Sequence, residues 1–237
     1  MSSLDCAAIN SKQAAAQIVA DFLASVVATE TGLERTGYSH MGATLTDTVL
    51  QAGLNYRSVV LPRVRHVLDV YPQANTTSNF WHVLCDFGPG TVLRWSHPEK
   101  IQRLNRIVDL FLTKNLETES DVASWLSSAS AAAELLSIKG IGPKTLDYLK
   151  ILVGIPSVAV DRHIRTLFRI VGLEYKDYDD FKSVIYQAAE ILNTQPQILD
   201  GIIWQYVSAR SGDTLHTCAT TKGEKPNPTE CEERRRG

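Results

Sequence analysis

The sequence lacks any apolar segment long enough to cross a bilayer. A membrane-spanning helix needs about 20 consecutive apolar residues, and no such run occurs in this chain. The first residues, MSSLDCAAINSKQAAAQ, also lack the basic segment followed by an apolar stretch that marks a secretory signal. We therefore expect a soluble intracellular protein with no membrane partner.

Cysteine is scarce, with four residues in a chain of 237. They are Cys6, Cys85, Cys218 and Cys231, too few and too widely spaced for a disulfide scaffold. This pattern agrees with a reducing compartment, so we expect free thiols.

The chain also lacks an excess of positive charge, with a formal net charge of −2 and a pI of about 6.3. Affinity for nucleic acid comes mainly from cations that neutralise phosphates, so the overall charge does not by itself predict such a partner. Between Lys139 and Arg169, however, six cations accompany two aspartates, a local balance of +4. This segment predicts a basic face, and the alternative is a salt-bridged helix surface.

Alternating apolar and polar residues, the sign of a half-buried strand, are absent, whereas eight or nine stretches show helical periodicity. These include Ser11 to Thr29, capped by Ser11, and segments at 45–54 and 59–70. A chain of this length with 44% hydrophobic residues can bury a sizeable core. We therefore predict an all-α fold.

One aromatic segment, Asn79 to Gly90, is closed by Gly-Pro-Gly, which predicts a turn or loop. Its aromatic residues Trp81 and Phe87, together with Trp95, are more typical of buried side chains than of a stacking surface. On that interpretation Cys85 is an ordinary core residue.

The most informative stretch carries Gly140 and Gly142 on either side of one isoleucine, followed by Pro143. Glycine tolerates positive φ, so both glycines are predicted to let the chain turn tightly and approach a ligand. Pro143 suits the first turn of a helix, whose N-terminal amides can bind phosphate. Further along, Asp161 is placed to cap the helix Arg162 to Val171 through its carboxylate.

These residues resemble a known family. The segment Lys139-Gly-Ile-Gly-Pro-Lys-Thr, followed by Val158-Ala-Val-Asp-Arg-His-Ile, is similar to the helix-hairpin-helix, Gly/Pro-Asp superfamily of base-excision DNA glycosylases. Within it, the chain looks most like the endonuclease III branch. The close resemblance covers about residues 130–175, and a looser helical resemblance reaches from about 43 to 210.

The resemblance implies two helical lobes that flank a DNA-binding cleft and contain a helix-hairpin-helix motif. The central lobe would comprise residues 43–156, and the second would combine residues 1–42 with 157–212, leaving 213–237 as a disordered tail. It implies a monomer whose partner is double-stranded DNA with a lesion or an abasic site. The location would be cytoplasmic and nucleoid-associated, or nuclear.

The resemblance also implies the site residues. Lys144 stands at the position of the branch's Schiff-base nucleophile, and Asp161 at that of the family's catalytic aspartate. Gln51 and Asn55, with Tyr56, are the candidates to fill the gap left by an extruded base, although Gly53 stands where the inserted side chain is expected. The full set of predicted DNA-binding residues is Lys139, Gly140, Ile141, Gly142, Thr145, Gln51, Asn55, Arg57 and His163.

The resemblance breaks near the C-terminus. Many endonuclease III-like enzymes bind a [4Fe-4S] cluster through four cysteines, whereas this chain offers Cys218 and Cys231 alone in that region. We therefore expect no iron-sulfur cluster and no catalytic metal, although carbonyl groups of the hairpin are candidates to hold a monovalent cation. Two alternatives stay open: a non-catalytic helix-hairpin-helix DNA-binding protein, and a monofunctional glycosylase that uses Asp161 and water.

Overall fold

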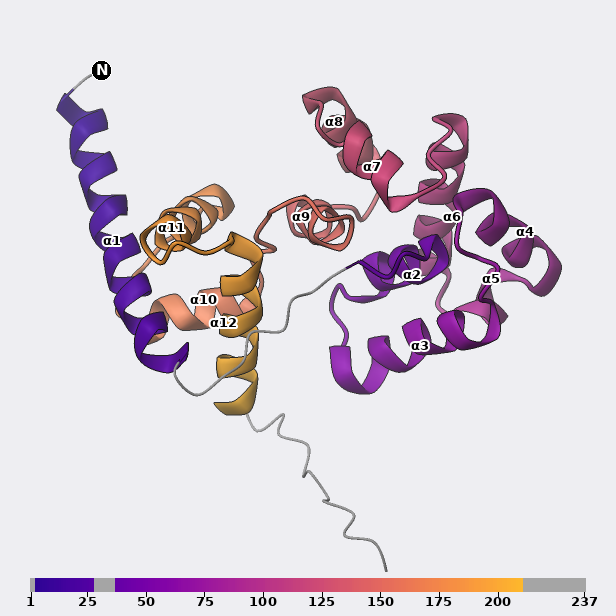
Figure 1. Ribbon diagram of the computed structural model, residues 1–237, viewed down its shortest axis with the longest axis horizontal. Helices are drawn as coiled ribbons and strands as arrows, with labels where there is room; N and C mark the ends of the chain where they lie inside the picture. The colour runs from indigo at the N-terminus through magenta and orange to yellow at the C-terminus, as the bar shows by residue number, and fades with distance from the viewer. Residues whose placement is uncertain (1–2, 28–36, 211–237) are drawn as a thin grey trace, which may run out of the picture.

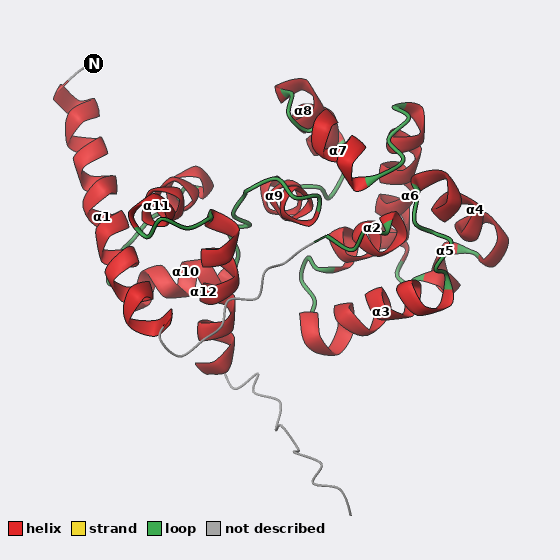
Figure 2. Cartoon of the chain, in the orientation of Figure 1, coloured by secondary structure: helices red, strands yellow, loops and turns green. Residues whose placement is uncertain are grey.

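The computed structural model describes residues 3–27 and 37–210. Every regular element in these ranges is a helix, and the described residues contain no strand (Figure 2). The all-α prediction is confirmed. Among the same residues, no helix combines the length and the apolar character needed to span a bilayer. The predicted tail, with Cys218 and Cys231, lies outside the described residues.

Within residues 3–27 and 37–210, the long helix α1 is followed by eleven further α-helices and one π-helical turn, η1. In order they are α1 (Ser3–Val27), α2 (Met41–Leu50), η1 (Tyr56–Val60), α3 (Leu61–Val70), α4 (Thr77–Phe87), α5 (Pro89–Val92), α6 (Pro98–Thr113), α7 (Glu119–Trp125), α8 (Ala129–Ser137), α9 (Pro143–Leu152), α10 (Arg162–Ile170), α11 (Tyr178–Ile191) and α12 (Pro196–Arg210).

Two hydrophobic clusters organise these helices. The first contains buried residues from Met41 to Val153, on α2 to α9. The second joins buried residues of α1 to those between Val158 and Val207, on α10 to α12. In Figure 1, α9 lies between the two groups of helices. A smaller cluster of α9 residues with Ala159 lies at this junction, so α9 helps to connect the two cores.

Helix α1 starts at Ser3, so the prediction that Ser11 caps it is wrong. The residues from Ser3 to Asn10 include neither glycine nor proline, and nothing in them stops a helix from extending towards the N-terminus. The predicted helix at 59–70 also has a different beginning, because its first turn is the π-helical η1 and α3 starts only at Leu61.

The aromatic segment forms the helix α4, which ends at the predicted Gly-Pro-Gly turn, where Gly88 has a φ of 76°. Thr76 caps this helix by accepting a hydrogen bond from the Asn79 amide. Trp81 and Phe87 are 39% and 52% exposed, and Cys85 is exposed as well. The predictions that bury them are wrong, because α4 turns a different stripe of residues towards the core.

Candidate functional site

The turn between α8 and α9 has one glycine with positive φ rather than two. Gly140 has φ of 88°, whereas Gly142 is extended, with φ of −113° and ψ of 179°, and occupies the N-cap position of α9. The Ile141 side chain between them is 5% exposed and packs into the first core. The left-handed conformation therefore explains Gly140 alone, and Pro143 lies in the first turn of α9 as predicted.

The two glycines also differ in their surroundings. A Cβ atom built on Gly140 would lie 2.0 Å from Nη2 of Arg103, so the guanidinium of this α6 residue rests against the turn. A Cβ atom on Gly142 would meet nothing within 4 Å. Gly142 thus presents open backbone at the start of α9, and the adjacent Lys139 is exposed.

This arrangement bears on the predicted monovalent cation. The Ile138 carbonyl accepts from the Ile141 amide at 2.9 Å, and the Gly142 carbonyl accepts from the Leu146 amide at 3.0 Å. Two carbonyl groups of the turn therefore already have backbone donors, and the positive charge of Arg103 lies beside Gly140. Each carbonyl keeps a second lone pair, whereas the charge of Arg103 would repel a cation beside Gly140, and the monovalent cation at the turn stays a prediction.

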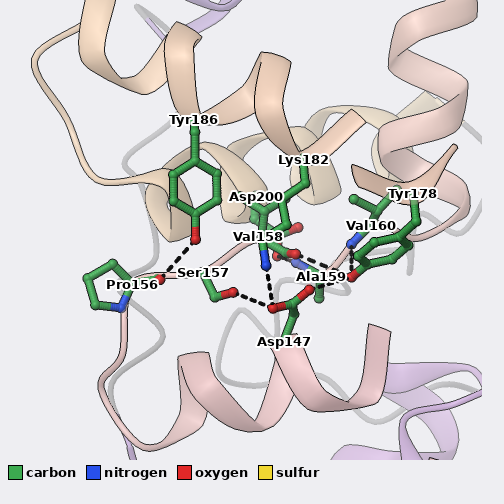
Figure 3. Close-up of polar contacts among 10 residues, drawn as sticks. All are labelled: Asp147, Pro156, Ser157, Val158, Ala159, Val160, Tyr178, Lys182, Tyr186 and Asp200. Atoms are coloured by element: carbon green, nitrogen blue, oxygen red, sulfur yellow. Dashed lines mark hydrogen bonds and ion pairs between the residues drawn. The ribbon is translucent and has the colours of Figure 1, made fainter. Parts of the chain in front are cut away.

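Asp147 of α9 is a buried carboxylate that ties α9 to the rest of the site. It is 3% exposed and accepts hydrogen bonds from Ser157 at 2.8 Å and from Tyr178 at 2.9 Å, while Lys182 forms an ion pair at 2.6 Å (Figure 3). Burial, followed by the Asp147 charge, raises the pKa of Tyr178 well above its usual value, so this hydroxyl stays a donor.

The segment before Asp161 is held by further contacts in the same region. The Tyr186 hydroxyl donates to the Pro156 carbonyl at 3.1 Å, and Asp200 accepts from the Ala159 amide at 3.2 Å (Figure 3). The Val160 amide donates to the Tyr178 hydroxyl at 3.2 Å. The amides of the buried residues Ala159 and Val160 thus have partners, and these contacts fix the segment that leads to Asp161.

Asp161 caps α10, as the sequence predicted. Its Oδ1 accepts from the amides of His163 at 2.7 Å and Ile164 at 3.3 Å, and its Oδ2 lies 2.7 Å from Nδ1 of His163. Burial alone would raise the pKa of Asp161, but the hydrogen bonds from His163 and the charge of Lys144 outweigh it. The pKa therefore lies below its usual value and the carboxylate stays ionised.

His163 connects Asp161 to α12. Because an ionised carboxylate can only accept, Nδ1 of His163 carries the hydrogen of that contact, and Nε2 lies 3.3 Å from the Ser208 hydroxyl. The imidazole is 7% exposed and both of its nitrogens have partners within the protein. His163, predicted to contact DNA, is therefore positioned to orient Asp161.

A pocket of about 830 Å³ brings most of these side chains together. Of the predicted residues, seven line it: Gln51, Asn55, Tyr56, Arg57, Lys144, Asp161 and His163. The other predicted residues lie outside its wall, and among them Ile141 and Thr145 are buried. Residues of the wall that the sequence did not single out as site residues are Gly53, Leu54, Ser58, Tyr148, Ala159, Arg162, Asp200, Trp204 and Ser208.

Trp204 of α12 supplies the largest aromatic surface of the pocket. The guanidinium of Arg57 lies 5.0 Å from the centre of its ring, and Tyr56 meets it edge-on at 6.1 Å. Behind the lining residues Tyr148 and Tyr56, the fully buried Asp47 accepts hydrogen bonds from their hydroxyl groups at 3.0 and 3.4 Å. The pocket thus combines aromatic surface with a few charged groups, as binding sites for small organic groups commonly do.

Lys100 of α6 fixes the end of α2 beside the pocket. Its ammonium donates to the carbonyl groups of Val49, Leu50 and Ala52 at 3.0, 3.3 and 2.8 Å. Burial, with added repulsion from Arg103 and Lys144, lowers the pKa of Lys100 to about 8. Nothing in the local sequence signals this role, because the lysine lies about 50 residues away from the helix end that it binds.

The model of a family described as a domain of unknown function (DUF8548) matches residues 95–208, which run from just before α6 to the last turn of α12. This range contains Lys144, Asp147 and Asp161 but excludes the wall formed by residues 51–58. No curated protein matches the chain.

Proposed function

We propose that this protein is a base-excision repair DNA glycosylase with lyase activity at abasic sites. The observation that carries the proposal is the pocket that contains both Lys144, from the first turn of α9, and Asp161, the cap of α10. An amine and an ionised carboxylate beside aromatic surface are the groups that base excision through a covalent intermediate requires. The sequence resemblance supports the same assignment.

Helices α8 and α9, with the turn between them, act in this proposal as the helix-hairpin-helix motif. Phosphate of double-stranded DNA would approach the open backbone at Gly142 and the N-terminal amides of α9. The exposed Lys139 adds positive charge beside this position. These contacts hold DNA without reading its sequence.

The damaged or mispaired nucleotide leaves the helix and enters the pocket. Extrusion costs a few kcal/mol, and least for a base that is already poorly paired. Trp204 and Tyr56 offer aromatic surface against which an extruded base can pack. Arg57, which lies over the Trp204 ring at the exposed edge of the pocket, must move aside or cover the base.

Asp161 stabilises the positive charge that develops at C1′ as the base departs, because its carboxylate is ionised and fixed by the α10 amides and His163. The Lys144 ammonium, whose charge acts on Asp161 in the resting site, first loses one proton to solvent. Its neutral amine then forms a bond to C1′ while the glycosidic bond breaks and the bonding electron pair leaves with the base. The nitrogen now bonded to C1′ loses a proton, and this proton passes to the departing base. Opening of the sugar ring at the C1′–O4′ bond, with a proton added to O4′, leaves an imine between C1′ and Nζ of Lys144. Loss of a C2′ proton then expels the 3′ phosphate.

Borohydride trapping on a duplex with an abasic site tests the proposal. The wild type is expected to give a covalent protein–DNA adduct, which Lys144→Gln abolishes because an amide cannot form the imine. Lys139→Gln is the matched control, since Lys139 is exposed on the turn and outside the pocket, and it should still trap. Trapping by Lys144→Gln at the wild-type rate would show that another residue is the nucleophile.

The same assay separates the alternatives. Base release from a panel of damaged duplexes without a trapped adduct would indicate a monofunctional glycosylase, in which Asp161 activates water. The absence of both base release and a trapped adduct would indicate a DNA-binding protein without catalytic activity. Asp161→Asn provides an independent arm, because it keeps the shape of the cap but removes the charge that stabilises C1′, and base release should be lost.

A further inference from the structure

Gln51 carries an unused hydrogen-bonding group in the wall of the pocket. It occupies the C-cap position of α2, and its backbone amide donates to the Asp47 carbonyl at 2.9 Å. The residue is 8% exposed, yet its side-chain Nε2 is buried without a hydrogen-bond partner. An unsatisfied buried donor is costly and rare, which makes it a sign of function.

The backbone around Gln51 is held in place by a residue from another helix. Lys100 donates to the carbonyl groups of Leu50 and Ala52, on either side of Gln51, and to that of Val49. The carboxamide is therefore attached to a backbone that is fixed in position. A fixed polar group in a pocket wall gives specificity without the entropic cost of ordering a loop.

This burial argues against insertion of Gln51 into the DNA stack. A side chain that fills the gap left by an extruded base must protrude from the surface, and Gln51 does not. Its neighbours after Gly53 in the same loop, Leu54 and Asn55, are more exposed, although the Asn55 side chain already accepts from the Ser58 amide at 3.0 Å. Gln51 instead lines the pocket that also contains Trp204.

We propose that Gln51 reads the hydrogen-bonding edge of the extruded base, an inference that rests on the proposed function and deepens it. A carboxamide offers one acceptor and two donors, so it pairs with a base edge that carries a donor next to an acceptor. The substrate class is therefore a base whose lactam or amino-imine edge is intact, with its damage located elsewhere on the ring or in its mispairing. A base methylated on that edge is excluded.

The test compares Gln51→Leu with the wild type on three duplexes that differ at one position: uracil, N3-methyluracil and an abasic site. The readouts are single-turnover base release and borohydride trapping. Loss of a bidentate contact should reduce the ratio of base release to abasic-site trapping on the order of tenfold to a hundredfold. Gln102→Leu, on the exposed surface of α6, is the matched control and should leave this ratio unchanged.

A second measurement keeps the inference independent of folding. Because Nε2 has no partner in the protein, Gln51→Leu should unfold at the same temperature as the wild type or at a higher one. Marked destabilisation, an unchanged ratio, or release of N3-methyluracil as fast as uracil would each overturn the role of Gln51. If the wild type traps abasic DNA and one of these outcomes occurs, the proposed function stands but the role of Gln51 does not. If the wild type neither traps abasic DNA nor releases a base, both the proposed function and the role of Gln51 are refuted.

Discussion

Replacing Asp147 with alanine should loosen the connection between α9 and the segments packed against it. The side chain links α9, which carries Lys144, to Ser157 and to Tyr178 and Lys182 of α11 (Figure 3). Alanine is the best helix former, so the change removes these contacts without disturbing the helix itself. The expected result is lower stability together with weaker trapping of abasic DNA.

The magnitude follows from what each partner can do afterwards. Ser157 is fully buried and loses its acceptor, which costs about 1–3 kcal/mol. Tyr178 has a second acceptor in the Val158 carbonyl at 3.4 Å, so its loss is smaller. The Lys182 side chain is 24% exposed and can turn to solvent, and removal of a buried charge offsets part of the cost. We expect the free energy of unfolding to fall by about 2–4 kcal/mol.

Urea denaturation followed by circular dichroism gives this free energy directly. Asp109→Ala is the matched control, because Asp109 lies on the exposed face of α6 and its loss should change the stability by less than about 0.5 kcal/mol. Trapping is then compared at a temperature where both variants stay folded. If Asp147→Ala were as stable as Asp109→Ala, the contacts of this carboxylate would not hold the site together.

Three further predictions concern the turn, the end of α2 and Asp161. Gly142→Ala should unfold like the wild type, but fluorescence anisotropy should show weaker binding to lesion-bearing and undamaged duplexes by the same factor. Gly140→Ala should lower the melting temperature, because Gly140 has a φ of 88°. If Gly142→Ala lowered the melting temperature and Gly140→Ala did not, the environments described for the two glycines would be wrong. Lys100 has a folded pKa of about 8 against 10.5 in the unfolded chain, so the unfolded state binds more protons between these values and the free energy of unfolding should rise with pH there. Denaturation curves of Lys100→Met should show no such rise of the unfolding free energy with pH. If the variant showed the same rise as the wild type, other titrating groups would be its cause. His163→Leu should move the acidic limb of the base-release pH profile to higher pH, because the pKa of Asp161 rises when its donor is lost, and an unmoved limb would show that the imidazole does not tune the carboxylate.

Local patterns in the sequence predicted the parts of the site that neighbouring residues decide. The cap formed by Asp161 depends on amides two and three residues further along the chain, so its position before an apolar helix was sufficient to predict it. The same holds for Pro143 at the start of α9. Gly142 was misinterpreted because a Gly-x-Gly pattern does not tell which glycine carries the positive φ.

Errors in the fold arose where several local signals compete. The Gly-Pro-Gly sequence predicted the turn that ends α4, but it does not show which side chains of the preceding helix are buried. Exposure of Trp81 and Cys85 then depended on which stripe met the first core. Composition alone carries no information about that choice, because both faces of the helix contain apolar residues.

The sequence by itself determined the all-α class, the turn before α9 and the cap of α10 by Asp161, since each depends on periodicity or on spacing within a short segment. The choice of Lys144 and Asp161 as a pair came from the family resemblance. Only the tertiary structure decided what surrounds that pair. Tyr148 meets Asp47 across 101 residues of chain, and Lys100 reaches a helix end about 50 residues away. Such contacts form because helices pack their apolar faces together, and the polar groups that meet at those junctions have no signature in either segment alone.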